Sequence, residues 1–236
     1  MLLSQTCLFH LFISDSIFSG PGIYPYQCDM GNPQEIEQMF EWIESNKELG
    51  KIDICINNAA CLWAKGLMEM NLQEMQTMLN VNILAYNYAT KLSVQSMLKN
   101  SVDDGQIIFI NSIFGHWVLP NPSMSFYTAT KQAIGSLLDG WRLELSSLGK
   151  NIRIGQVSPG FIKTEAVETA FGREASEAIY GSTPHLSCED VAAGILQILE
   201  AKTHVLTQDV ILRHVHEDPA ILTGGIGGIG EGNSNK

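Results

Sequence analysis

Short apolar segments alternate with longer segments of helical spacing along most of this chain. The short segments are rich in β-branched residues and bounded by Gly, Asn or Asp, which predicts strands over residues 23–28, 52–56, 106–110, 152–157 and 209–213. Apolar positions between them recur every three or four residues, which predicts helices over 33–47, 72–98, 127–148 and 189–201. Ser187 can cap the start of the last of these helices. Because apolar strands separated by helices form parallel sheets covered on both faces, we predict an α/β fold.

Length and composition narrow the classes of protein to consider. A chain of 236 residues that is 45% hydrophobic and 17% charged can fill the core of one α/β domain. Its net charge of −11 argues against a partner that is a nucleic acid. Five cysteines without a Cys-x-x-Cys pair favour reduced thiols and a cytoplasmic location.

The N-terminus carries an apolar run over residues 7–13, which has two interpretations. It has the character of the hydrophobic stretch of a signal peptide, but no Lys or Arg precedes it, which favours a strand or helix edge. No apolar run approaches the eighteen or so residues that span a bilayer, so we predict no membrane span.

A candidate for chemistry lies at the start of the third predicted helix. Tyr127 and Lys131 are four residues apart, so their side chains share one helix face. We expect the lysine cation to lower the pKa of the phenol toward a useful range. Such a pair alone is also typical of an ordinary solvated helix. The functional interpretation is favoured by polar residues at or just after the ends of predicted strands: Ser112, Asn57, the 158–160 turn and Thr164.

Taken in order, these motifs resemble those of the short-chain dehydrogenase/reductase family over about residues 22–213. The resemblance rests on Cys28-Asp29, Asn57-Asn58-Ala59, Val81-Asn82, Asn111-Ser112, Tyr127 with Lys131, and Pro159-Gly160 with Thr164. Segments 115–120 and 126–131 are similar to the farnesol dehydrogenase-like branch, whose relatives include reductases of keto steroids. The family resemblance implies a Rossmann-like sheet and an NAD(P)-dependent oxidoreductase that interconverts a hydrophobic alcohol and its aldehyde or ketone.

The resemblance also implies roles for four catalytic residues. Tyr127 would exchange a proton with the substrate oxygen, and Ser112 would hydrogen-bond the same oxygen. Lys131 would hold the ribose hydroxyls and favour the phenolate. Asn82 would bind a water that links Lys131 to solvent, although a solvated helix asparagine is the alternative interpretation.

Cofactor contacts implied by the resemblance spread along the predicted strand ends. Asp29 would lie at the adenine edge, and Thr164 would bond the carboxamide. The other implied contacts are Asn57, Ala59, Tyr127, Lys131, Pro159 and Gly160. The branch resemblance favours NADP, with NAD as the alternative.

Apolar residues after two of the strands suggest a flap over the substrate. Trp117, Val118, Phe161 and Phe171 suit a long apolar alcohol, such as farnesol, or a steroid. The alternative is that they simply pack against the domain. His214 and His216 lack a third ligand at a defined spacing, so we predict no metal site.

The chain departs from the family pattern at its start. Residues 1–18 hold no glycine turn, so we predict that they form an atypical segment. Residues 19–216 are then an incomplete dinucleotide-binding domain that lacks the first βαβ unit of the family. We predict a disordered tail over residues 217–236. Ala60 also stands where the family prefers glycine.

Two alternatives follow from this departure. Residues 223–230 fit the missing glycine motif and are either a relocated copy of it or part of a disordered tail. The chain itself is either an active oxidoreductase, for which we expect a homodimer through the two long helices, or a weakly active or inactive fragment that at most pairs with a full-length partner.

Overall fold

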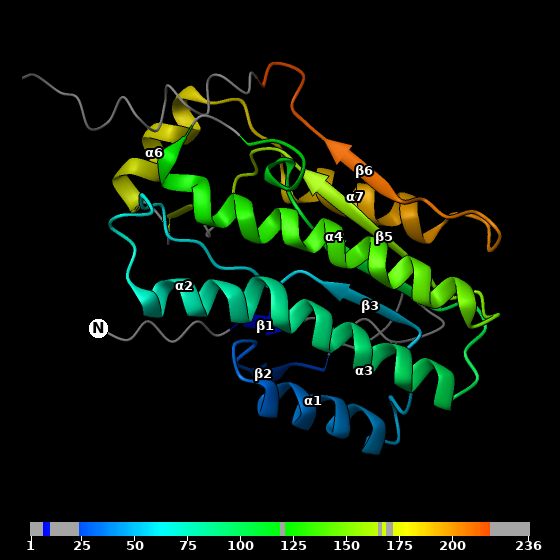
Figure 1. Cartoon of the computed structure of the whole chain (residues 1–236). Coiled ribbons are helices and arrows are strands. Elements are labelled where there is room, and N and C mark those ends of the chain that lie inside the picture. The colour runs from blue at the N-terminus through cyan, green and yellow to red at the C-terminus, as the bar shows by residue number, and fades with distance from the viewer. Residues whose placement is uncertain (1–6, 10–23, 119–120, 165–166, 169–171, 218–236) are drawn as a thin grey trace, which may run out of the picture.

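The computed structural model describes residues 7–9, 24–118, 121–164, 167–168 and 172–217 (Figure 1). Its central feature is a sheet of four strands: β3 (Ile54–Asn57), β4 (Gln106–Ile110), β5 (Arg153–Pro159) and β6 (Asp209–Leu212). They lie in the order β3-β4-β5-β6, and each pair of neighbours is parallel. The predicted α/β fold is therefore confirmed, and all four strands end at the same rim of the sheet.

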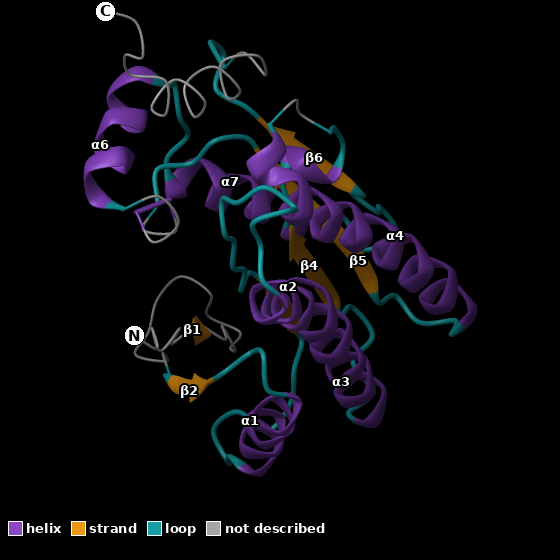
Figure 2. Cartoon of the chain, turned by 60° about the vertical axis from the view of Figure 1, so that its left-hand side comes forward, coloured by secondary structure: helices purple, strands orange, loops and turns teal. Residues whose placement is uncertain are grey.

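Helices cover both faces of this sheet, as predicted (Figures 1 and 2). One face packs against α3 (Tyr86–Lys99) and α4 (Ser125–Ser147), with Phe109 in the shared core. The other face packs against α7 (Cys188–Leu199) around Ile108 and Val157. Because successive side chains of a strand point to opposite faces, the fully buried β4 supplies both cores.

Capping residues place the starts of several helices. Asn32 caps α1 (Pro33–Ser45), and Asn71 forms a capping box at α2 (Leu72–Leu79). Ser187 and Asp190 form a second capping box at α7, as the sequence predicts for Ser187. These side chains satisfy amide groups that have no partner within the helix, which stabilises each helix start.

The long helix predicted over 72–98 is interrupted. The structure has α2, then a π-helical turn over Asn80–Ala85, then α3. A π-helical turn adds a residue to the helical repeat, which hydrophobic periodicity does not reveal. Such turns are frequent at functional sites, and this one contains Asn82.

The strand predicted over 23–28 needs a correction. The structure has β2 (Tyr26–Cys28), which pairs antiparallel with β1 (Cys7–Phe9) in a separate two-stranded sheet and not with the described parallel strands (Figure 2). A short apolar run predicts a strand but does not specify its partner. The sequence analysis also missed α6 (Arg173–Ser182). No helix in the described part of the chain is long and apolar enough to cross a membrane.

Candidate active site

A phenol and a hydroxyl meet at the rim where the parallel strands end. Ser112 follows β4 and begins a 3₁₀ turn over Ile113–Gly115, where its Oγ accepts a hydrogen bond from the Phe114 amide at 3.3 Å. Tyr127 lies in the first turn of α4, and the nearby Ser112 hydroxyl acts to lower the pKa of its phenol. The Phe114 ring packs edge-on against the Tyr127 ring with centroids 5.8 Å apart. The structure thus brings the two side chains together.

Lys131 lies one helical turn further along α4 and is only 1% exposed. Its Nζ donates to the Ile110 carbonyl at 2.8 Å, and the Tyr86 hydroxyl donates to the same oxygen at 3.0 Å. The amine lies 5.7 Å from the centroid of the Tyr127 ring. The strand end, the amine and the phenol are therefore parts of one buried cluster.

Burial dominates the electrostatics of this pair. It lowers the pKa of Lys131 to about 7, and it raises the pKa of Tyr127 above its ordinary value. The Ser112 hydroxyl opposes the rise at Tyr127. The expectation that Lys131 lowers the phenol pKa is wrong for this structure, because burial disfavours the lysine cation that would stabilise a phenolate.

Asn82 is fully buried, and both its Oδ1 and its Nδ2 atoms hydrogen-bond to other protein groups. Its Oδ1 accepts from the Cys61 amide at 2.9 Å, and its Nδ2 donates to the Cys61 carbonyl at 2.9 Å and to Thr130 Oγ1 at 3.1 Å. The solvated-asparagine alternative is therefore wrong. The side chain joins the loop after β3 to α4, which carries the phenol. Its link to a water stays a prediction.

Two other residues, one at the end of β3 and one just after it, are also buried. Asn57 Nδ2 donates to Thr90 Oγ1 of α3 at 3.2 Å, which ties the strand end to a helix. Ala59 is buried, and Ala60 is exposed. Their contacts with a cofactor stay predictions.

Pro159 and Gly160 end β5, where the Gly160 amide donates to the Leu212 carbonyl at 2.7 Å. A Cβ atom on residue 160 would lie 2.1 Å from Glu217 Oε2, so a larger residue there would displace the Glu217 carboxylate. The Glu217 side chain is buried against this turn, its Oε1 is 3.7 Å from Arg213 Nε, and burial raises its pKa. Sequence analysis missed Glu217 because it lies 57 positions from Gly160 and belongs to no motif.

Thr164 is held by an aromatic residue that the sequence analysis also missed. The Tyr180 hydroxyl accepts from the Thr164 amide at 2.9 Å and donates to its carbonyl at 2.7 Å. The Tyr180 ring stacks on Phe161, with centroids 5.5 Å apart. Phe161 therefore packs against α6, as the simpler of its two interpretations predicts.

The other predicted pocket residues differ in what the structure says of them. Trp117 and Val118 are exposed, Val118 by 74%, which suits the lip of a site. Phe171 lies outside the described residues, as do residues 223–230 with the second glycine motif.

An open pocket of about 540 Å³ lies beside the start of α4. Its walls come from Gly66–Glu69, after β3, and from Asn121–Ser125, directly before Tyr127. Met68 in this wall is 99% exposed. The apolar pair Leu67-Met68 in a loop was the available sequence signal, and its spacing fits no motif.

Asp29 lies apart from this cluster, in the turn after β2. Its Oδ1 accepts from the Gly31 amide at 2.8 Å, and its own amide donates to Glu35 at 2.8 Å. Its carboxylate is exposed. These hydrogen bonds are local to the turn, so the adenine role stays a prediction.

The described part of the chain has no cluster of side chains that could bind a metal ion. No group of three or more His, Cys, Asp or Glu residues is placed to hold an ion among residues with described positions. His214 Nδ1 accepts a hydrogen bond from the His216 amide at 3.1 Å, so this ring nitrogen bonds within its own turn.

A partly buried phenol, with a buried hydroxyl and a buried amine, at the ligand rim of a parallel α/β sheet defines the class as an oxidoreductase of Rossmann-like fold. The model of the family described as short chain dehydrogenase matches residues 15–175. The chain belongs to the short-chain dehydrogenase/reductase family and is an NAD(P)-dependent oxidoreductase by family.

Individual relatives agree with this assignment. The chain is 36% identical to dehydrogenase/reductase SDR family member 11 of Gallus gallus over 196 residues, which cover 82% of this chain and 76% of that protein. It is 30% identical to farnesol dehydrogenase of Aedes aegypti over 198 residues, covering 84% and 77%. Among solved structures, the closed form of serine dehydrogenase complexed with NADP+ is 26% identical and superposes with a TM-score of 0.71, covering 79% of this chain and 73% of that one.

The described residues fit one end of a dinucleotide better than the other. Lys131 bonds the carbonyl that ends β4, and Gly160 follows the end of the neighbouring strand β5, so both lie at the rim where the nicotinamide and its ribose would lie. Within the described ranges, no glycine-rich turn opens a helix at a parallel strand end to receive the pyrophosphate. The residues therefore support binding at the nicotinamide end.

Proposed function

We propose that this protein interconverts a hydrophobic alcohol and its aldehyde or ketone, with Tyr127 as acid and base. The observation that carries the proposal is the Tyr127 phenol beside the Ser112 hydroxyl at the ligand rim, where Phe114 of the Ser112 turn packs against the Tyr127 ring. A nicotinamide cofactor, NADP by preference and NAD as the alternative, supplies or accepts the hydride. The solved structure of serine dehydrogenase complexed with NADP+, which is 26% identical to this chain, supports NADP.

Each side chain has one task in this proposal. In the direction of reduction, the Tyr127 hydroxyl donates its proton to the substrate oxygen, and a raised pKa keeps that proton in place until then. Ser112 fixes the direction of the same oxygen by a hydrogen bond. Lys131 holds the ribose hydroxyls, since its amine keeps at least one donor hydrogen beyond the one bound to Ile110 in either protonation state.

The substrate class rests on the walls around this rim. Exposed Trp117 and Val118 lie just beyond the Ser112 turn, and Leu67 and Met68 line the pocket beside α4. Apolar walls of this kind favour an isoprenoid such as farnesol, or a steroid, over a sugar. The identity with a farnesol dehydrogenase supports the isoprenoid choice and the farnesol dehydrogenase-like branch.

The test mixes the purified chain with NADPH or NADH and a panel of isoprenoid, steroid and sugar carbonyls. We expect nicotinamide absorbance to fall with the apolar carbonyls and to stay level with the sugars. Cofactor alone should also raise the melting temperature, since a ligand that binds only the folded state stabilises it. No turnover with any carbonyl, together with an unchanged melting temperature, contradicts the proposal.

A second candidate function is pairing through the long helices. Leu79 and Leu84 along the α2–α3 segment and Leu143 on α4 are exposed, although leucine is usually buried. We expect a homodimer in sedimentation experiments, weakened by Leu143→Asp and unchanged by Leu206→Asp, which alters an exposed leucine outside these helices. A monomer that associates only with a full-length relative would favour the fragment alternative.

A further inference from the structure

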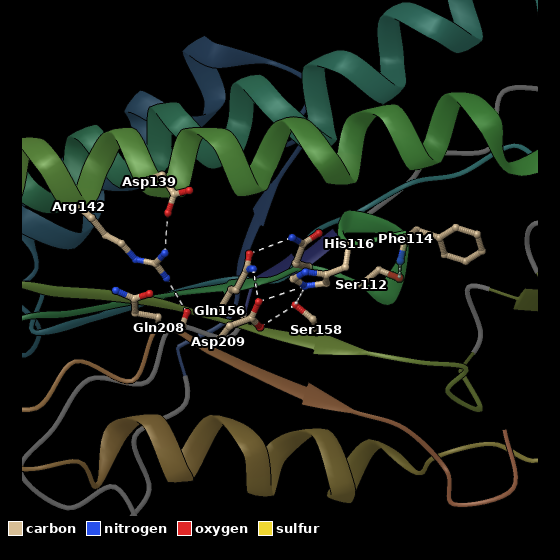
Figure 3. Close-up of polar contacts among 10 residues, drawn as sticks. Ser112, Phe114, His116, Asp139, Arg142, Gln156, Ser158, Gln208 and Asp209 are labelled. Atoms are coloured by element: carbon tan, nitrogen blue, oxygen red, sulfur yellow. Dashed lines mark hydrogen bonds and ion pairs between the residues drawn. The ribbon is translucent and has the colours of Figure 1, made fainter. Parts of the chain in front are cut away.

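Five polar side chains form a network behind the Ser112 turn (Figure 3). They come from the end of β4, from the turn itself, from β5 and from β6: Asn111, His116, Gln156, Ser158 and Asp209. Gln156 lies opposite Asp209 in the β5–β6 register, and Ser158 follows two positions later on the same face. This network takes no part in the proton transfer proposed for Tyr127.

The Asp209 carboxylate is the acceptor at the centre of the network. Gln156 Nε2 donates to its Oδ2 at 2.7 Å, and Ser158 Oγ donates to its Oδ1 at 2.9 Å. His116 Nε2 lies 3.1 Å from Oδ2 and 2.9 Å from Ser158 Oγ. Because a carboxylate only accepts and the Ser158 proton already points to Asp209, Nε2 carries a proton and is the donor.

His116 ends the same 3₁₀ turn that Ser112 begins. The Gly115 amide donates to the Ser112 carbonyl at 2.9 Å, and the His116 and Trp117 amides donate to the Ile113 carbonyl at 3.0 Å. This short turn is thus fixed at its far end by a side chain that reaches across to β5 and β6 (Figure 3).

Asn111 supports the turn from below. Its Nδ2 donates to Gln156 Oε1 at 2.9 Å, which joins it to the same network. A Cβ atom on Gly115 would lie 2.5 Å from Asn111 Nδ2, so the turn rests directly on this amide. The position of the Ser112 hydroxyl therefore depends on two contacts with the network, one at Gly115 and one at His116.

We propose that His116 is a positioning residue for Ser112: its hydrogen bonds to Ser158 and Asp209 anchor the turn that aims the Ser112 hydroxyl at Tyr127. The effect on turnover rests on the proposed function, whereas the anchoring can be measured without it. A displacement of about 1 Å at a reacting group can cost on the order of a hundredfold in rate.

The test compares two variants of His116. His116→Phe keeps a ring but removes the donor, and His116→Gln keeps a donor at about the same reach. The matched control is His204→Phe, since His204 is exposed and lies outside the network. Amide hydrogen exchange of Gly115, His116 and Trp117 is followed by NMR without cofactor, and kcat, KM and the cofactor Kd are measured with an active carbonyl.

We expect His116→Phe to speed exchange at these three amides and to lower kcat by about 10–100-fold, with the cofactor Kd within about twofold. His116→Gln should restore most of both quantities, and His204→Phe should match the parent protein. Should His116→Phe fail to fold, Gly115→Ala replaces it, because its added methyl group displaces the turn from Asn111.

Unchanged exchange at the three amides in His116→Phe overturns the proposal. So does an equal loss of kcat and cofactor affinity that His116→Gln does not restore, because that pattern marks a general structural role. If the parent protein itself shows no turnover, the proposed function fails, and the exchange experiment still decides whether His116 anchors the turn.

Discussion

The Ser112–Tyr127 rim and the Asp29 turn are held by contacts of different range. At the rim, the hydrogen bonds join residues far apart in the chain, such as Lys131 to Ile110 and Asn82 to Thr130. At the Asp29 turn they join residues at most six positions apart. The rim is buried within the four-stranded sheet, whereas Asp29 is exposed beside the separate β1–β2 pair.

This difference indicates that the protein is rigid enough for proton transfer at the rim and not at the Asp29 turn. Proton transfer needs side chains held in one geometry, and cross-linked burial provides that at the rim. An exposed turn held by local contacts can add affinity for a ligand but contributes little to orientation. We therefore expect substitutions at the rim to change rate or stability, and substitutions at Asp29 to change affinity alone.

The largest effect is expected for Tyr127→Phe, which removes the proton donor and keeps the ring. Because general acid catalysis contributes about 10²–10⁴-fold, kcat for carbonyl reduction should fall by that factor. The cofactor Kd should change little. The matched control is Tyr24→Phe, which alters a phenol bonded to Glu48 outside the rim. Substantial kcat in Tyr127→Phe would assign the proton to another group.

Asn82→Ala should mainly lower stability. It leaves the Cys61 amide and carbonyl without the Asn82 partner in a buried site, and each unsatisfied buried group costs about 1–3 kcal/mol. We expect the free energy of unfolding in urea to fall by about 2–4 kcal/mol. Asn100→Ala is the control, since Asn100 bonds only within its own helix end. Equal losses in the two variants would contradict a cross-linking role.

Lys131→Met tests the pKa of the buried amine through its pH dependence. The pKa is about 7 in the fold and about 10.4 in the unfolded chain, so unfolding takes up a proton between these values. The free energy of unfolding of the parent protein should therefore rise from pH 7 to pH 9 relative to that of Lys131→Met. Denaturant unfolding at several pH values measures the difference. A constant difference would show that the lysine stays charged in the fold.

The smallest effect is expected for Asp29→Ala. An exposed hydrogen bond contributes about 0.5–1.5 kcal/mol, so the cofactor Kd should rise by about 2–10-fold while kcat and the melting temperature stay unchanged. Asp103→Ala, another exposed aspartate, is the control. Cofactor titration by fluorescence gives the Kd values. An unchanged Kd in Asp29→Ala would remove the adenine-edge role.

Much of this arrangement could be predicted without coordinates. Strand and helix periodicity placed the four parallel strands and α1, α4 and α7 to within a few residues. The Tyr127–Lys131 spacing placed both side chains on one helix face, and Ser187 marked the start of α7. These predictions succeed because they depend on local backbone preferences and on side-chain spacing.

Other features depend on contacts that no local pattern encodes. The antiparallel pairing of β2 with β1, the π-helical turn at Asn82 and the meeting of Tyr180 with Thr164 each involve partners distant in the chain or a change of helical repeat. The contact of His116 with Asp209 could not be predicted, because the two residues are 93 positions apart and His116 stood out only as part of a family-like segment.

The amino-acid sequence by itself determined the order of strands and helices and the identity of the groups at the rim. Only the tertiary structure decided their ionisation, because burial in a medium of low polarity raises the pKa of the Tyr127 phenol and lowers that of the Lys131 amine. A buried side chain carries a charge only where the surrounding fold stabilises that charge, and those surroundings come from residues that lie far apart in the chain.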